Sequence, residues 1–246
     1  RAIFVESLAN PGGVIVDLEA IAKIAQEAEV PLIVDNTMAT PWLCRPFEWG
    51  ADLVVHSTTK FLSGQGNAMG GIVIDSGRFP WFGNAKYPSL SEPCPDYNGL
   101  TFAETFGDMA FTLYSHAVSL RDLGCTQSPM NAWITLNGVE TLPLRMERHV
   151  ENAQKVAGFL QQHPSVEWVS YAGLSSSPYY QLAQKYLQGK AGSVFTFGIR
   201  GGYESGLRLL EKVELFSHVS NIGDSRSLIL HPASTTHRQL SDEQRL

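Results

Sequence analysis

Residues 52–66 read Asp-Leu-Val-Val-His-Ser-Thr-Thr-Lys-Phe-Leu-Ser-Gly-Gln-Gly, an apolar run that gives way to a polar, glycine-rich stretch. The apolar part is short and rich in β-branched residues, which predicts a buried strand ending at a site. Just past the strand end, Lys60 follows the hydroxyls of Ser57 and Thr59. A lysine can act as a Schiff-base nucleophile, and hydroxyls and loop amides suit a phosphate. A solvated turn would have the same local composition, but together these groups indicate pyridoxal phosphate.

A second strand that ends in a carboxylate strengthens this interpretation. Residues 31–37 read Pro-Leu-Ile-Val-Asp-Asn-Thr, and the spacing from Asp35 to Lys60 suits adjacent strands of an α/β sheet joined by a crossover. Ligands of such sheets bind at the carboxyl ends of the strands, so we expect both side chains to face one crevice. A carboxylate beside the pyridine nitrogen of the cofactor keeps that nitrogen protonated, which makes the ring an electron sink.

Three motifs in order resemble the Cys/Met-metabolism family of pyridoxal-phosphate enzymes, which includes the cystathionine γ-synthases and lyases. They are Val-Asp-Asn-Thr-Met-Ala-Thr-Pro at 34–41, Val-His-Ser-Thr-Thr-Lys at 55–60 and His-Pro-Ala-Ser-Thr-Thr-His at 231–237. Within the family, residues 87–93, 96–100 and 104–107 look most like the O-acetylhomoserine sulfhydrylases. The resemblance covers essentially the whole chain.

The resemblance implies an α/β fold, the type I, aspartate-aminotransferase-like fold of pyridoxal-phosphate-dependent transferases. Lys60 would hold the cofactor, Asp35 would pair with its ring nitrogen, and Ser57 and Thr59 would contact its phosphate. Asn10 matches a family asparagine that contacts cofactor and substrate, although an asparagine before a proline is equally typical of a turn.

Ser220 is assigned to a family Ser-Leu-Gly segment that meets the substrate carboxylate, with one extra residue intervening. His231 and His237 are six residues apart, and a structural role for them is favoured over metal binding because no third ligand has suitable spacing.

The function implied by the resemblance is replacement at the γ carbon of O-acetyl-L-homoserine by sulfide or methanethiol, giving homocysteine or methionine and acetate. A γ-lyase that serves methionine or cystathionine is an alternative, because the same cofactor and lysine serve both reactions. A non-catalytic fragment or subunit is a second alternative, of another class. The family also implies a homotetramer built as a dimer of dimers.

Composition bounds the other possibilities. With 246 residues, 43% of them hydrophobic, the chain can bury a core, and its net charge of −6 argues against a nucleic-acid partner. No apolar stretch reaches the roughly 18 residues needed to span a bilayer, so no membrane partner is expected. The three cysteines lie far apart and are interpreted as free thiols of a reducing compartment, which favours a cytoplasmic location. No targeting segment is recognised at the start of the sequence.

The chain divides into a cofactor-binding part, residues 1–150, and a small C-terminal α+β domain, residues 151–246. We expect strands at 2–7, 31–35, 52–56 and 70–75, and a helix capped by Asp17. The first strand would form an exposed apolar edge, since family members are longer and the chain is predicted to lack the N-terminal part of their large domain.

Residues 76–100 show no periodicity and are predicted to form an ordered surface loop near the site or at a subunit contact. Helical spacing follows at 101–124 and at 131–162, where Pro143 interrupts it. In the C-terminal part we expect strands at 167–171 and 193–199 and short helices at 179–187 and 203–210.

Overall fold

A four-stranded mixed sheet carries the predicted site, and the computed structural model describes residues 1–235. The strands lie side by side in chain order, with β1, β2 and β3 parallel and β4 antiparallel to β3. Their bounds are β1 Ile3–Glu6, β2 Leu32–Asp35, β3 Leu53–Ser57 and β4 Gly71–Asp75. These bounds confirm the four predicted strands. The parallel pairs place the carboxyl ends of β1, β2 and β3 along one edge of the sheet.

Two helices follow the first two strands. The helix α1, Leu18–Glu27, begins where Asp17 Oδ1 accepts a hydrogen bond of 3.2 Å from the backbone N–H of Ala20, as the sequence predicted. It buries Leu18 and Ala25 in the main core. The helix α2, Thr40–Leu43, lies in the connection between β2 and β3. The chain thus makes two crossovers between parallel strands.

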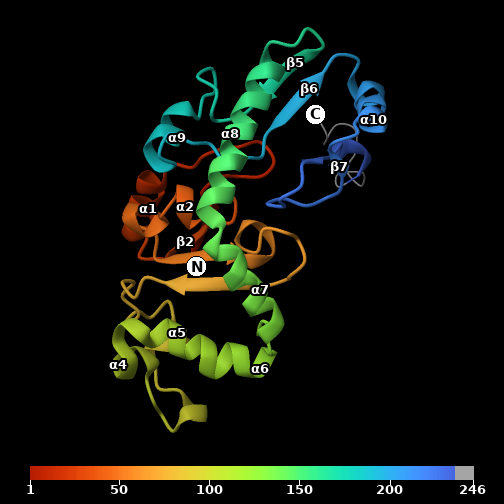
Figure 1. Cartoon of the computed structure of the whole chain (residues 1–246). Helices are drawn as coiled ribbons and strands as arrows, with labels where there is room; N and C mark the ends of the chain where they lie inside the picture. The colour runs from red at the N-terminus through yellow and green to blue at the C-terminus, as the bar shows by residue number, and fades with distance from the viewer. Residues whose placement is uncertain (236–246) are drawn as a thin grey trace.

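A helix pair links the sheet to the C-terminal part. The helices α7, Pro129–Glu140, and α8, Leu142–Gln161, meet at Thr141, and Pro143 lies in the first turn of α8. Proline fits there because the first turn of a helix has no internal partner for its N–H groups. In Figure 1, α8 rises from the level of the sheet to the C-terminal strands. It runs without a break across residue 150, so the division of the chain at that point stays a prediction.

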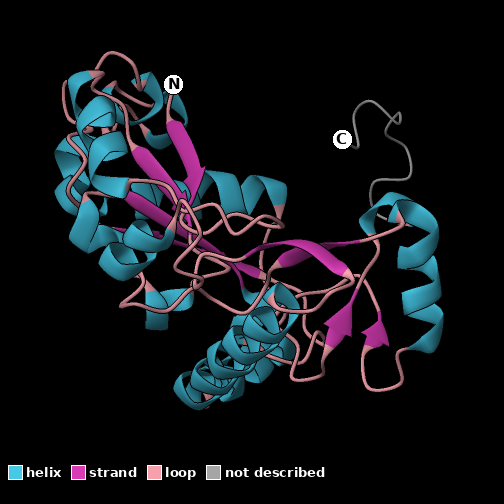
Figure 2. Ribbon diagram, turned by 90° about the horizontal axis from the view of Figure 1, so that it is seen from above, coloured by secondary structure: helices cyan, strands magenta, loops and turns pink. Residues whose placement is uncertain are grey.

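After α8, the described residues up to 235 form two small sheets and two further α-helices. The strands β5, Val166–Ser170, and β6, Thr196–Ile199, are antiparallel, whereas β7, Ser217–His218, and β8, Leu228–Ile229, are parallel. The helices are α9, Tyr180–Tyr186, and α10, Gly202–Lys212, and Figure 2 shows α10 on the opposite side of the molecule from the N-terminal strand. These elements confirm the predicted α+β content.

One hydrophobic core runs through both parts of the chain. It joins Leu32 and Val34 of the sheet to Met146 and Ala157 of α8 and to Tyr171 beyond β5. A hydrogen bond of 2.5 Å between the hydroxyl of Tyr186 and Asp17 Oδ1 further ties α9 to the start of α1. The predicted C-terminal domain therefore packs directly on the helices that cover the sheet.

Residues 76–124 form a second, separate cluster below β4 in Figure 1. The predicted ordered surface loop at 76–100 is corrected in its secondary structure and in its position near the site, while the predicted subunit contact stays a prediction. Residues 76–100 contain the short helix α3, Pro88–Ser91, and bury Phe79 and Trp81. The hydroxyl of Tyr87 donates to the carbonyl of Arg1, just ahead of β1 and hence at the amino end of the sheet, opposite Lys60. The predicted helical spacing at 101–124 is confirmed as a broken series that includes α4 Phe102–Phe106, α5 Ala110–Tyr114 and α6 Arg121–Leu123.

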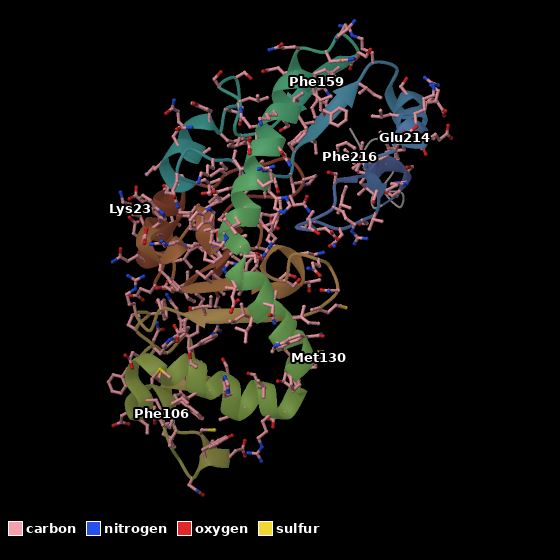
Figure 3. The ribbon with its side chains drawn as sticks, viewed as in Figure 1. Lys23, Phe106, Met130, Phe159, Glu214 and Phe216 are labelled. Carbon is pink, nitrogen blue, oxygen red and sulfur yellow. The ribbon has the colours of Figure 1, made fainter. Side chains whose placement is uncertain are left out.

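Several large apolar side chains lie on the surface. Met130 at the start of α7 and Phe159 near the end of α8 are 63% and 64% exposed, and both are labelled in Figure 3. Phe4 on the outer strand β1 is 59% exposed, as expected for an apolar sheet edge. Across residues 1–235 no helix has the length and apolar character needed to cross a membrane.

Candidate active site

The ends of β2 and β3 are joined by hydrogen bonds that continue past the sheet. Asp35 lies opposite Val55 in the parallel register, and the N–H of Asn36 donates to the carbonyl of Val55 over 2.9 Å. Beyond this point the N–H of Ser57 donates to Thr37 Oγ1 over 2.8 Å. The predicted carboxylate and the predicted lysine segment therefore share one edge of the sheet.

Lys60 lies in an irregular turn directly after β3. Residues Thr58–Leu62 form a single π-helical turn, in which the N–H of Ser63 donates to the carbonyl of Thr58 over 3.1 Å. Such turns recur at functional sites because they re-aim side chains. Lys60 is half-buried, and its Nζ donates a hydrogen bond of 2.8 Å to Asn221 Oδ1. The amine is thus held by a residue from the far end of the chain.

The segment around Asn221 packs closely on the lysine turn. A Cβ atom on Gly223 would lie 2.5 Å from the backbone nitrogen of Phe61 and 2.8 Å from the carbonyl carbon of Lys60, so only glycine fits this position. The N–H of Ser225 donates to the carbonyl of Gly64 over 3.0 Å. These backbone contacts fix the position of the Asn221 amide.

Asn221 contacts Lys60 and was missed by sequence reasoning, which assigned the neighbouring Ser220 to the substrate; that assignment stays a prediction. Ser220 is exposed in the structure, whereas the neighbouring asparagine meets Lys60. Aligning Asn221-Ile222-Gly223 with the Ser-Leu-Gly pattern removes the extra residue that the first alignment required. That simpler alignment was the available signal.

Asp35 keeps one carboxylate oxygen available. The N–H of Thr37 donates to Asp35 Oδ1 over 2.9 Å, and within residues 1–235 no hydrogen bond reaches Oδ2. His56 on the adjacent strand is buried, and its Nδ1 has no described hydrogen-bond partner. Burial lowers the pKa of His56, although the nearby Asp35 opposes this effect. A neutral His56 places no positive charge on β3 beside the Asp35 carboxylate.

The two predicted phosphate ligands differ in their surroundings. Thr59 Oγ1 donates to the carbonyl of Gly70 over 3.3 Å and accepts from the Gly70 N–H over 3.1 Å. The Ser57 hydroxyl makes no hydrogen bond to the described part of the chain, so its proton is free for an anion. Thr59 would have to turn its proton away from Gly70 to serve a phosphate in the same way.

Asn10 lies in the loop after β1, the third strand end on this edge. It is exposed, and its backbone N–H donates to Glu6 Oε2 over 3.1 Å. No hydrogen bond from Asn10 to Asp35 or Lys60 occurs among the described residues. The structure therefore places Asn10 on the edge formed by the carboxyl ends of the parallel strands, but not in hydrogen-bond contact with Asp35 or Lys60.

The donor set at this edge fits pyridoxal phosphate. An amine at Lys60 matches an aldehyde, a free carboxylate oxygen at Asp35 matches a protonated ring nitrogen, and an unpaired hydroxyl at Ser57 matches a phosphate. Two hollows of the described surface lie away from this edge. One, of about 310 Å³, is lined by apolar residues of the 76–124 cluster, and the other, of about 610 Å³, lies between α8 and α9.

Comparison with known proteins identifies the family. Residues 1–246 match the family described as Cys/Met metabolism PLP-dependent enzyme. The chain belongs to this family. It is 50% identical to the O-acetyl-L-homoserine sulfhydrylase of Leptospira meyeri, over 100% of the chain and 58% of that relative. It is 44% identical to the homocysteine synthase of Schizosaccharomyces pombe, again over 100% of the chain and 58% of that relative. The chain thus spans just over half the length of these relatives.

A solved structure supports the same assignment. A Campylobacter jejuni protein assigned as an O-acetylhomoserine (thiol)-lyase superposes with a TM-score of 0.94 at 43% identity, over 99% of this chain and 58% of that protein. That crystal structure contains a pyridoxyl-lysine phosphate. The family, the α/β transferase fold and the pyridoxal phosphate cofactor predicted from the sequence are confirmed.

Other candidate groups lie apart from this cluster. His231 Nδ1 pairs with Ser234 Oγ at 3.0 Å, and its ring packs against Tyr203 at 5.0 Å. His237 lies outside the described residues, and residues 1–235 contain no group of three possible metal ligands. The three cysteines are free, and burial raises the pKa of the Cys44 thiol to about 12, which makes it a poor nucleophile.

Proposed function

We propose that the protein exchanges the acetate group of O-acetyl-L-homoserine for a sulfur nucleophile, sulfide or methanethiol. The bond from Cγ to the ester oxygen breaks, a bond from Cγ to sulfur forms, and the thiol proton leaves with acetate. The products are then homocysteine or methionine and acetate. The observation that carries this proposal is the 50% identity, over the full length of the chain, to a relative named for this reaction.

Residues of this chain are proposed to hold the cofactor at the carboxyl ends of β2 and β3. Lys60 would bind it through Nζ, Asp35 would pair with the ring nitrogen, and Ser57 and Thr59 would contact the phosphate. Pyridoxal phosphate supplies an electron sink that lowers the cost of removing protons beside the amino group. Asn10 stays a proposed contact of cofactor and substrate, and Ser220 a proposed substrate contact; both residues are exposed, which is compatible with these roles.

The Lys60 amine is proposed to move protons between the α and β carbons of the substrate. A proton-transferring group must lie within hydrogen-bond reach of the atom that it serves, so its direction has to be controlled. Asn221 supports this role, because its carbonyl oxygen accepts from Nζ over 2.8 Å and thereby fixes where the amine points. We therefore add Asn221 to the proposed site as the residue that holds the free amine.

A homotetramer and a cytoplasmic location are also part of the proposal. Support for assembly comes from the exposed apolar residues Met130 and Trp133 on α7, which are 63% and 61% exposed and would be covered in a larger assembly. Light scattering of the purified protein, with an expected mass of four subunits, tests the assembly.

Borohydride reduction and substrate assays test the function. We expect the purified protein to show a visible absorption band that bleaches on reduction and leaves a pyridoxyl group on Lys60, found by peptide mapping. A Lys60→Ala variant should lose more than 99% of the turnover. Sulfide-dependent homocysteine supports replacement, whereas release of a keto acid without sulfide would indicate a γ-lyase. Wild-type turnover in Lys60→Ala would refute the proposed role of this lysine.

A further inference from the structure

Arg145 on α8 binds the turn that carries Lys60, although it is not part of the proposed cofactor site. Its Nη1 donates to the carbonyl of Phe61 over 2.8 Å, and its Nη2 donates to the carbonyls of Leu62 over 3.4 Å and Gly138 over 2.7 Å. Its Nε donates to Thr141 Oγ1 over 3.1 Å. All three nitrogens of the guanidinium are therefore engaged.

The guanidinium is half-buried without a compensating anion. No carboxylate of residues 1–235 forms an ion pair with Arg145, and its partners are carbonyls and one hydroxyl. Burial of a charge is costly unless hydrogen bonds replace its water shell. A neutral side chain would avoid this cost, so the cation contributes something beyond packing at this position.

That contribution lies in the irregular geometry of the turn. Lys60 departs from helical geometry, with φ of −92° and ψ of −122°, and interrupts the regular pattern of backbone hydrogen bonds. The carbonyls of the next two residues, Phe61 and Leu62, instead receive N–H groups from Arg145. A planar fork with several fixed donors can bind two neighbouring carbonyls at once, whereas an ammonium group is a single point of charge.

Two glycines permit this approach. A Cβ atom on Gly64, which has a φ of +79°, would lie 2.5 Å from Arg145 Nη1. A Cβ atom on Gly138 of α7 would lie 2.3 Å from the carbonyl oxygen of Leu62. A side chain at position 138 would push the lysine turn away from α7, and one at position 64 would displace the Arg145 guanidinium. The turn is therefore fitted closely between α7 and the Arg145 guanidinium.

We propose that Arg145 is a positioning residue, which holds the carbonyls of the lysine turn so that the Lys60 amine keeps its direction at the end of β3. This inference rests on the proposed function of Lys60. Arg145 acts through the backbone of the turn and does not itself touch substrate or cofactor. It complements Asn221, which holds the same lysine by its side-chain nitrogen.

The test compares Arg145→Lys with Arg148→Lys in the holoenzyme. Arg148 lies on the same helix, its side chain is 74% exposed, and it pairs with Glu151 at 3.3 Å, so its replacement controls for helix propensity and charge. Hydrogen–deuterium exchange reports on the amides of Ser63 and Gly64, whose N–H groups close the turn. In Arg145→Lys we expect these two amides to exchange roughly tenfold faster, corresponding to the loss of about one charged hydrogen bond.

Two further measurements accompany exchange. The dissociation constant for pyridoxal phosphate should rise roughly tenfold in Arg145→Lys, and kcat should fall more than KM changes, whereas Arg148→Lys should match the wild type. An Arg145→Met variant is expected to show the same pattern more strongly. If it does not fold, Arg145→Lys decides the result alone, because it keeps the positive charge and the volume of the stem.

The outcomes separate this inference from the proposed function. Faster exchange confined to the turn supports the positioning role. Unchanged exchange in the turn, or exchange that rises equally throughout α7 and α8, would overturn it and leave Arg145 as a helix-stabilising residue. Absence of a pyridoxyl group on Lys60 in the wild type would refute the proposed function instead, and it does not depend on the exchange result.

Discussion

Replacing Gly223 by alanine tests whether the C-terminal segment truly seats on the lysine turn. Gly223 has a φ of +72°, and an added Cβ atom would lie 2.5 Å from the nitrogen of Phe61 and 2.8 Å from the carbonyl carbon of Lys60. Both neighbours are backbone atoms, so no change of side-chain rotamer can relieve the contact. The segment that carries Asn221 would have to move away from Lys60.

The expected loss has two components. A left-handed backbone costs an alanine about 1–2 kcal/mol. Steric overpacking adds about 1–3 kcal/mol, so Gly223→Ala should lower the free energy of unfolding by about 2–5 kcal/mol. Gly124 provides a matched control, since its φ is +68° and no atom lies within 4 Å of an added Cβ. Gly124→Ala should therefore show the backbone component alone.

Urea unfolding of the two variants gives the difference directly. We expect Gly223→Ala to be less stable than Gly124→Ala by about 1–3 kcal/mol. Its affinity for pyridoxal phosphate should also fall, since Asn221 no longer meets the Lys60 amine, while Gly124→Ala keeps the wild-type affinity. Equal losses of stability and unchanged cofactor affinity in both variants would refute the close contact between this segment and the turn.

Two further predictions concern groups outside the site. Iodoacetamide at pH 8 should alkylate the exposed Cys125 and spare Cys44, because burial shields this thiol and raises its pKa to about 12; peptide mapping that finds native Cys44 modified would contradict this. Tyr186→Phe removes the hydrogen bond to Asp17, so stability should fall by about 1 kcal/mol at pH 7. The bond lowers the pKa of Asp17 from 3.8, so its contribution to stability is complete above this pH and disappears as the pH falls through the lower pKa. The variant should therefore lose less stability than the wild type between pH 5 and pH 2. Urea unfolding that shows the same change of stability with pH in both proteins would disprove the coupling.

The strands and α1 were predictable because their signals are local. The β-branched run before His56 fixes β3, and Asp17 marks the start of α1 through a hydrogen bond to a residue three positions away. The pairing of Asp35 with the lysine segment also followed, since parallel strands joined by a crossover must end on the same edge of a sheet. Sequence could therefore define the frame of the site and two of its main groups.

The contacts that hold Lys60 were not predictable, because they join residues remote in sequence. The guanidinium of Arg145 donates to the carbonyl of Phe61, 84 residues earlier in the chain, and no periodic pattern in the sequence predicts such a contact. The alternative that placed residues 76–100 near the site was wrong for a related reason. Its aromatic residues lack a regular period because Phe79, Trp81 and Tyr87 pack on one another, with ring centres 4.5–5.6 Å apart, and do not face the main core.

The hydrogen bond between Lys60 and Asn221 joins two residues that are synthesised at different times. The two residues are 161 positions apart, and ribosomes add about 5–20 residues per second, so the partner of the amine is made roughly 10–30 s after the lysine itself. During that interval β1, β2 and β3 can pair, since all three are already complete. During this interval the Lys60 amine lacks its Asn221 partner, which is supplied only by the segment between β7 and β8.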